Sequence, residues 1–227
     1  MIRSIFQALT DFIQNVFERM KEWRQRLEQL CEQEEYEIQL EQEDIKYWPE
    51  KVDILLGLQC KEYLLSIFPD GIQAGVQNMS NDELLGLFQM IERDAAEIMG
   101  VSVDGVDFYT TMDEPYCHYG GYYNPEDNTF HINMTYVYSA PPNYIEYEIY
   151  AIFHELKHAR QFAAVKGRLN HTKDYGYSDK LLDEWEKNMS NYIPMEENDE
   201  LYMKQPLEMD SRGFESIVSG ERQFEVI

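Results

Sequence analysis

Apolar residues recur every three or four positions through residues 2–30 of the chain, and no glycine or proline interrupts them. This spacing predicts a long helix with an apolar seam along one side. The pattern leaves two alternatives open: the seam packs against a neighbouring helix of the same chain, or it pairs with the same helix of a second copy. A membrane-surface helix is disfavoured because the polar face lacks dense Lys and Arg. The acidic, Gln-rich residues 32–43 indicate a solvated continuation or a linker.

Two further helices are expected before residue 100. Residues 51–68 are apolar almost all round and end at a Pro-Asp-Gly turn, which predicts a buried helix. The next helix starts at a capping-box sequence, with Ser80 at the N-cap and Glu83 three residues later. Gly100 ends the apolar periodicity that follows and is the expected C-cap.

The pattern then changes to short segments rich in Tyr, Phe, Thr and Val, at residues 106–112, 118–124 and 129–137. Turn residues separate them, which predicts a three-stranded antiparallel meander. A Pro-Pro-Asn sequence then precedes a long amphipathic pattern over residues 144–166, which predicts another helix. The expected fold class is therefore α+β.

The same change of pattern predicts two regions, a helical N-terminal region at residues 1–75 and a mixed region at residues 76–227. A unit of about 150 residues is large enough to bury its own apolar surface. The apolar helix at residues 51–68 must also bury its surface, so a single integrated domain is the alternative.

Charge and composition narrow the function classes. The 227 residues include 43 Asp and Glu against 19 Lys and Arg, a formal net charge of −24. Such a charge repels phosphate backbones and argues against binding of nucleic acid. No apolar run is long enough to span a membrane, and polar residues interrupt the apolar start where a signal peptide needs a pure run, so a cytoplasmic protein is expected. Three widely spaced cysteines indicate free thiols.

The predicted helix at residues 144–166 contains His154-Glu155-Leu156-Lys157-His158, an H-E-x-x-H pattern. Its two histidines lie one turn apart on one face, where both imidazoles can reach a single metal ion. The apolar residues of the helix fall mainly on the opposite side. The histidines are therefore expected to face away from the packing surface.

A zinc hydrolase needs three protein ligands and one open position for water. The metzincin continuation after the second histidine is absent. His171 and Asp174 are possible ligands in the following loop. Glu208 is the stronger candidate, because it projects beside the apolar stripe of a helix predicted to start at Pro206, one helix away from the histidines. The alternative is an ordinary first-turn glutamate that the helix dipole favours.

With these residues the sequence resembles the gluzincins, zinc metallopeptidases whose H-E-x-x-H helix is followed by a second helix that supplies a glutamate ligand. It is most similar to their minimal versions, over residues 80–227. The resemblance implies a zincin-like core with a small antiparallel sheet, an H-E-x-x-H helix and a glutamate-bearing helix. It implies Zn²⁺ as cofactor, bound by His154, His158 and Glu208, and a peptide or protein as substrate. Glu155 would act as general base toward a zinc-activated water.

In such enzymes the strand upstream of the metal helix pairs with an extended substrate, which implies Gly121, Tyr122 and Tyr123 as substrate-binding residues. Larger gluzincins often place an acidic residue four positions after the glutamate ligand. Here Arg212 occupies that position, and Asp210 stands two positions after the glutamate. The sequence therefore does not identify the residue that orients the histidines.

An oxyanion donor is also needed, and Tyr175, Tyr177, Tyr202 and His171 lie in the segment between the two ligand-bearing helices. The sequence does not choose among them. In a chain with 17 tyrosines, any single one is more often structural.

The rival interpretation is a non-enzymatic acidic helical protein that sequesters a basic partner or mimics nucleic acid. It explains the net charge, but not the order of edge strand, metal helix and glutamate helix. Metal content separates the two, because the zinc site predicts about one zinc per chain.

Overall fold

The computed structural model describes residues 49–111, 120–138 and 140–221. The predicted helix at residues 2–30 and the acidic run at residues 32–43 lie outside the described residues. The described part has an α+β fold, with seven α-helices and one small mixed sheet of three strands. None of its helices is both long and apolar enough to cross a membrane.

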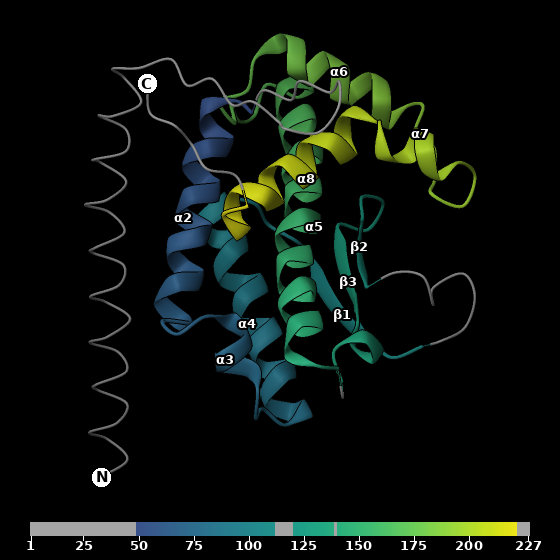
Figure 1. The fold of residues 1–227 in the computed structure, drawn as a ribbon. Coiled ribbons are helices and arrows are strands. Elements are labelled where there is room, and N and C mark those ends of the chain that lie inside the picture. Colours follow the sequence, from purple (N-terminus) through teal and green to yellow (C-terminus); the bar gives the residue numbers. More distant parts are fainter. Residues whose placement is uncertain (1–48, 112–119, 139, 222–227) are drawn as a thin grey trace.

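Helix α5 runs through the middle of the described part, with α2 and α4 on one side, the sheet on the other, and α8 crossing it (Figure 1). The elements in chain order are α2 (Lys51–Ile67), α3 (Ile72–Val76), α4 (Asn81–Met99), β1 (Gly105–Tyr109), β2 (Gly121–Asn124), β3 (Thr129–Asn133), a 3₁₀ turn (Met134–Tyr136), α5 (Pro142–Leu169), α6 (Asp179–Met189), α7 (Asp199–Met203) and α8 (Pro206–Ser219).

The local helix signals are confirmed. The Ser80 hydroxyl accepts from the Glu83 backbone N–H at 3.4 Å, and the Glu83 carboxylate accepts from the Ser80 N–H at 2.8 Å, which completes the capping box of α4. Gly100 closes this helix in the left-handed region, with φ 64°. Pro142 and Pro206 stand in the first turns of α5 and α8, where the missing N–H costs nothing.

The predicted antiparallel meander is wrong in one strand. The strand order is β1-β3-β2, with β2 antiparallel to β3 but β1 parallel to it. A tight turn at residues 125–128 joins β2 to β3, whereas a long connection separates β1 from β2. The long connection allows β1 to pair with β3 on the side opposite β2, because two parallel strands cannot be joined by a tight turn. Strand β2 is consequently an edge strand, and it contacts α5.

Helix α2, which the predicted boundary at residue 75 places in the N-terminal region, shares the main core. Its residues Cys60, Tyr63 and Leu64 belong to the same buried cluster as the apolar faces of α4 and α5. Its Gly57 lies directly against α8, since a Cβ at this position would come within 2.6 Å of Ile217 Cγ2. The division at residue 75 stays a prediction, but α2 and α8 are in close contact.

Two glycine substitutions test this contact. We expect Gly57→Ala to lower the free energy of unfolding by about 1–3 kcal/mol, because the added methyl group overpacks the interface between α2 and α8. Gly86→Ala is the matched control: Gly86 is exposed within α4 with open space around it, so alanine should stabilise the helix by about 0.5–1 kcal/mol. Urea unfolding measures both, and equal stabilisation by both variants would contradict the packing of α2 on α8.

Candidate metal centre

The structure brings together the three residues that the sequence predicts as metal ligands. His154 and His158 extend from α5, and Glu208 extends from the first turn of α8. The two histidine Nε2 atoms lie 3.2 Å apart. His154 Nε2 is 3.4 Å from Glu208 Oε2, and His158 Nε2 is 3.3 Å from Glu208 Oε1.

This triangle fits a metal ion. An ion with tetrahedral bonds of about 2.0–2.1 Å holds neighbouring ligand atoms about 3.3–3.4 Å apart. The two Nε2 atoms are close to this separation, and each lies at a similar distance from one oxygen of Glu208, Oε2 for His154 and Oε1 for His158. Glu208 is 1% exposed, and its Oε2 is buried with no hydrogen-bond partner among the described residues. A positive charge beside it stabilises a buried carboxylate, and the two imidazoles or a metal ion bound between them can supply that charge. His154, His158 and Glu208 can therefore hold a metal ion.

Packing of α8 explains why Glu208 reaches the histidines. One side of this helix is buried: Leu207, Phe214 and Val218 belong to the apolar clusters, and Ile217 packs against Gly57 of α2. Glu208 stands beside that stripe and turns toward α5, which α8 contacts closely. His171 and Asp174, the alternative ligands, are exposed in the loop after α5 and are not part of the triangle.

The Nδ1 atoms of both histidines also have partners. These partners were not predicted from the sequence. His154 Nδ1 lies 3.2 Å from Glu215 Oε2, so the imidazole can donate there and keep Nε2 available for a metal. His158 Nδ1 lies 2.9 Å from Gln161 Oε1 and 3.2 Å from Ser211 Oγ. A helical wheel could have suggested Glu215, because it follows Glu208 by two turns on the same face of α8.

Asp210 and Arg212, which the sequence left open as orienting groups, have other roles. Asp210 Oδ2 accepts from Gln161 Nε2 at 2.7 Å, so it acts on His158 through Gln161. The Arg212 guanidinium donates to the Met203 carbonyl and ties α8 to α7.

Behind the histidines, Lys157 is fully buried between two carboxylates. Its Nζ lies 2.6 Å from Asp53 Oδ1 of α2 and 2.9 Å from Asp210 Oδ2 of α8, and it donates to the Tyr177 hydroxyl at 3.1 Å. Burial alone would lower the pKa of Lys157, but Asp210 and Asp53 outweigh it and raise this pKa. Burial raises the pKa of Asp53 to about 6 against the opposing effect of Lys157. The metal-bearing helix is thus bound to both α2 and α8 through one buried charge.

Glu155 faces the edge strand. Its Oε2 accepts from the Tyr123 backbone N–H at 2.9 Å. The Gly120 carbonyl accepts from Asn133 N–H, so the antiparallel ladder bonds residues 120, 122 and 124 to β3. The backbone groups of Gly121 and Tyr123 therefore point to the open edge, beside Glu155.

Of the three predicted substrate-binding residues, Tyr122 has a different environment. Its backbone faces β3 in the ladder, and its ring stacks on His131 with centroids 4.6 Å apart. Of these three residues, Gly121 and Tyr123 direct their backbone groups to the open edge of β2.

The predicted oxyanion donors divide into two groups. Tyr202 lies at the metal centre, and its ring packs edge-on against Tyr192, whose hydroxyl donates to Glu208 Oε1 at 2.8 Å. Burial, followed by the charge of Glu208, raises the pKa of both tyrosines, which keeps them neutral donors. Tyr192 was not predicted from the sequence, because no local pattern distinguishes it from the other tyrosines.

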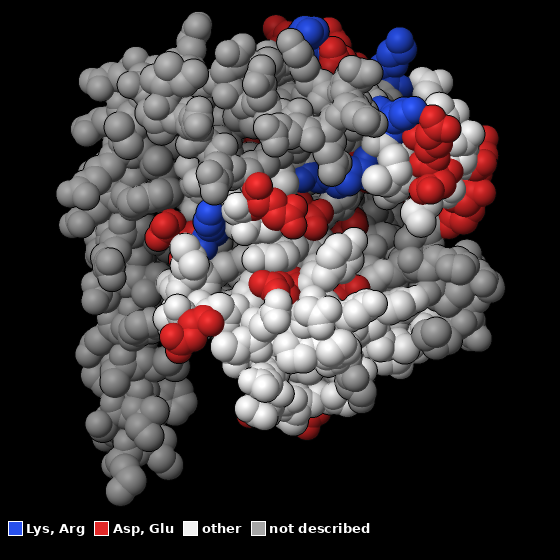
Figure 2. Space-filling model, viewed as in Figure 1, with Lys and Arg blue, Asp and Glu red and all other residues white. Residues whose placement is uncertain are grey.

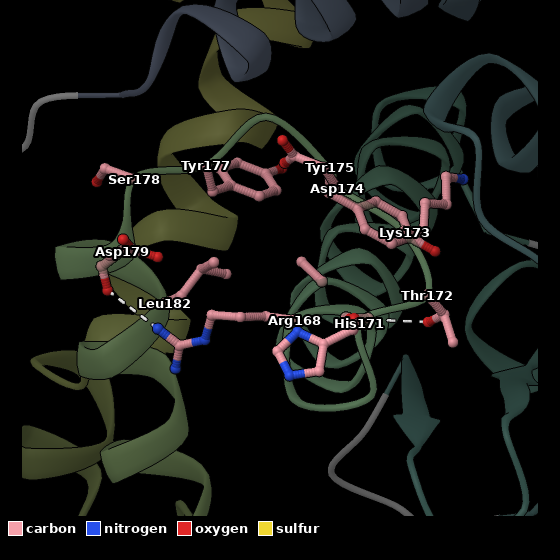
Figure 3. A pocket seen from close by; sticks show the side chains of 12 residues that line it. Arg168, His171, Thr172, Lys173, Asp174, Tyr175, Tyr177, Ser178, Asp179 and Leu182 are labelled. Atoms are coloured by element: carbon pink, nitrogen blue, oxygen red, sulfur yellow. Dashed lines mark hydrogen bonds between the residues drawn. The ribbon is translucent and has the colours of Figure 1, made fainter.

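Tyr175, Tyr177 and His171 lie away from the metal triangle. They line a surface pocket of about 630 Å³ at the C-terminal end of α5 (Figure 3). The Tyr177 hydroxyl accepts hydrogen bonds from Lys157 Nζ and, at 2.8 Å, from Arg160 Nε. Tyr177 therefore stabilises the fold and does not serve as an oxyanion donor.

A second carboxylate of α5 faces the same strand as Glu155. Glu148 is 8% exposed, and no residue of the described part forms a hydrogen bond or ion pair with it. Burial raises its pKa to about 7. The carboxylate lies against Gly120, immediately before β2.

Comparisons of the chain with protein-family models, with curated proteins and with solved structures find no match. The site geometry therefore carries the functional inference alone.

The burial of Glu148 predicts a pH-dependent gain in stability on its removal. Its pKa is raised from 4.5 to about 7 in the folded protein, so the ionised form destabilises the fold and the wild type loses stability as the pH rises through this interval. We expect Glu148→Gln to raise the free energy of unfolding by about 1–3 kcal/mol at pH 8 and to change it little at pH 4. Urea unfolding at both pH values measures the difference.

Glu146→Gln controls for the loss of one negative charge from the same helix. Its carboxylate accepts from Gln73 near the surface, and the substitution should change the stability by no more than about 0.5 kcal/mol. Destabilisation by Glu148→Gln at pH 8 would show that Glu148 has a stabilising partner.

Proposed function

We propose that this protein is a zinc-dependent peptidase of the gluzincin type. The observation that supports it best is the triangle of His154, His158 and Glu208, in which each imidazole Nε2 lies within 3.4 Å of the other and of one Glu208 oxygen. Glu155 stands next to this triangle and faces an open strand edge. A metal-binding triangle, an adjacent carboxylate and a peptide-binding edge are the components that peptide hydrolysis needs.

The donor set favours zinc among the common metals. Two imidazole nitrogens and one carboxylate oxygen, with a fourth position open, are typical of catalytic zinc sites. When bound, zinc supplies a Lewis acid that makes water nucleophilic near neutral pH. Glu215 and Gln161 hold the two imidazoles with Nε2 directed at the common centre.

Glu155 is the proposed general base. It takes a proton from the attacking water and later returns this proton to the amine that leaves the cleaved peptide bond. In the structure its carboxylate is held by the Tyr123 N–H, at the border between the triangle and β2.

The substrate is proposed to extend along β2. Gly121 and Tyr123 direct their backbone groups away from β3, to the edge where a peptide strand can add, and the Tyr123 N–H is held there by Glu155. On the opposite side, Tyr192 and Tyr202 have hydroxyl groups near Glu208 and are the proposed donors to the oxyanion that develops on the attacked carbonyl.

The net charge of −24 favours a second candidate, an acidic protein that sequesters a basic partner. This candidate gives no reason for two imidazoles and a buried carboxylate to converge beside Glu155. Hydrolysis and metal content separate the candidates.

Replacement of the proposed base tests the peptidase. We expect Glu155→Gln to retain zinc and thermal stability but to reduce hydrolysis of a peptide library by about 10²–10⁴-fold, because the amide keeps the shape and loses the base. Mass spectrometry of the products and elemental analysis of the protein measure both properties. Removal of zinc by a chelator should abolish wild-type hydrolysis and added zinc should restore it. Glu146→Gln is the matched control, and hydrolysis that persists in Glu155→Gln would reject the assignment.

A further inference from the structure

We propose that Glu148 forms a subsite for a basic side chain, Lys or Arg, of the peptide substrate. The inference rests on the proposed peptidase function and adds its substrate preference. Its basis is a buried carboxylate without a partner, placed on the substrate side of the metal-bearing helix.

Glu148 and Glu155 lie on the same face of α5, two turns and about 10.5 Å apart along the helix. Glu155 touches Tyr123 of β2, and Glu148 touches Gly120 at the start of the same strand. Helix α5 and strand β2 therefore run side by side in the same direction, and both carboxylates face the strand. A peptide that adds to β2 beside Glu155 continues toward Glu148.

Gly120 makes room for the carboxylate. A Cβ at residue 120 would lie 2.8 Å from Glu148 Oε1 and even closer to Oε2, so any side chain there would displace the group. The carboxylate is thus held at the entrance to β2 by shape, without a hydrogen bond from the described residues.

The energetics indicate a ligand of positive charge. An ionised carboxylate that is buried without a partner destabilises the fold. Three other buried carboxylates have such partners: Asp53 and Asp210 contact Lys157, and Glu208 contacts the histidines. A Lys or Arg side chain from the substrate would supply the missing charge, and its long aliphatic stem can reach a recessed group. Figure 2 shows acidic side chains on the face of the molecule seen there, and their negative charge favours a basic peptide.

The spacing gives the position of the basic residue. An extended peptide advances about 3.3 Å per residue, so the distance of about 10.5 Å corresponds to about three residues from the cleaved bond. Because β2 runs from Gly120 toward Tyr123, a peptide paired antiparallel to β2 carries this residue on the C-terminal side of the cleaved bond.

The test uses a set of peptides in which Lys or norleucine occupies each of four positions on either side of the cleaved bond. For the zinc-loaded wild type we expect kcat/KM to favour Lys over norleucine by about 10- to 100-fold near the third position, the range of one charge-assisted hydrogen bond. Glu148→Gln should reduce this ratio to nearly one, whereas Glu146→Gln should keep it. A wild type without the preference, or a Glu148→Gln variant that retains it, would overturn the proposal.

A binding measurement keeps the subsite distinct from the peptidase. Fluorescence anisotropy with the zinc-loaded Glu155→Gln protein should give at least about tenfold tighter binding of the Lys peptide than of the norleucine peptide, and the added Glu148→Gln substitution should remove the difference. If peptides are cleaved but this difference is absent, the subsite is wrong and the peptidase stands. If the difference is present and no peptide is cleaved by the wild type, the subsite stands and the peptidase is wrong.

Discussion

The buried charge of Lys157 determines how the parts of the site meet. Lys157 precedes His158 directly, and its ammonium group lies between Asp53 of α2 and Asp210 of α8. Asp210 follows Glu208 by two residues, so the ion pair that holds α8 against α5 also sets the height at which Glu208 meets the histidines. Removal of one partner would leave an uncompensated buried charge, at a cost of about 3–5 kcal/mol. The arrangement of three helices and the shape of the metal triangle therefore depend on the same interaction.

The two faces of α5 differ in how their charges are satisfied. On the face toward α2 and α8, every charge of the Lys157 group has a partner within 3 Å. On the face toward β2, Glu148 has no ion-pair partner among the described residues, and Glu155 accepts a hydrogen bond from the Tyr123 N–H and lies near the charges of His154 and His158. The paired charges around Lys157 stabilise the fold. A buried carboxylate without a partner does not stabilise it, so the residues that face β2 are better explained by the proposed function. The groups that face the strand are the ones a substrate would complete.

Local patterns in the sequence predicted what depends on neighbouring residues. The capping box at Ser80, the proline that starts α8, and the two histidines one turn apart each follow from short-range geometry, and the structure has them as expected. The order of the strands did not follow, because the pairing of β1 with β3 depends on a long connection rather than on a turn. Tyr192 was missed for the same reason, since its role arises only when the loop before α7 folds back toward α8. Glu215 was missed although it lies two turns after Glu208 on the same face of α8.

Anomalous X-ray diffraction at the zinc absorption edge, from crystals of the zinc-loaded protein, tests the metal centre most directly. We expect one strong peak, within about 2.0–2.2 Å of His154 Nε2, His158 Nε2 and a Glu208 carboxylate oxygen, and no other peak of comparable height. The peak should vanish from crystals grown after chelation and return after soaking in zinc. A peak elsewhere, such as beside His131 and Asp107, or the absence of a peak between α5 and α8, would contradict the account.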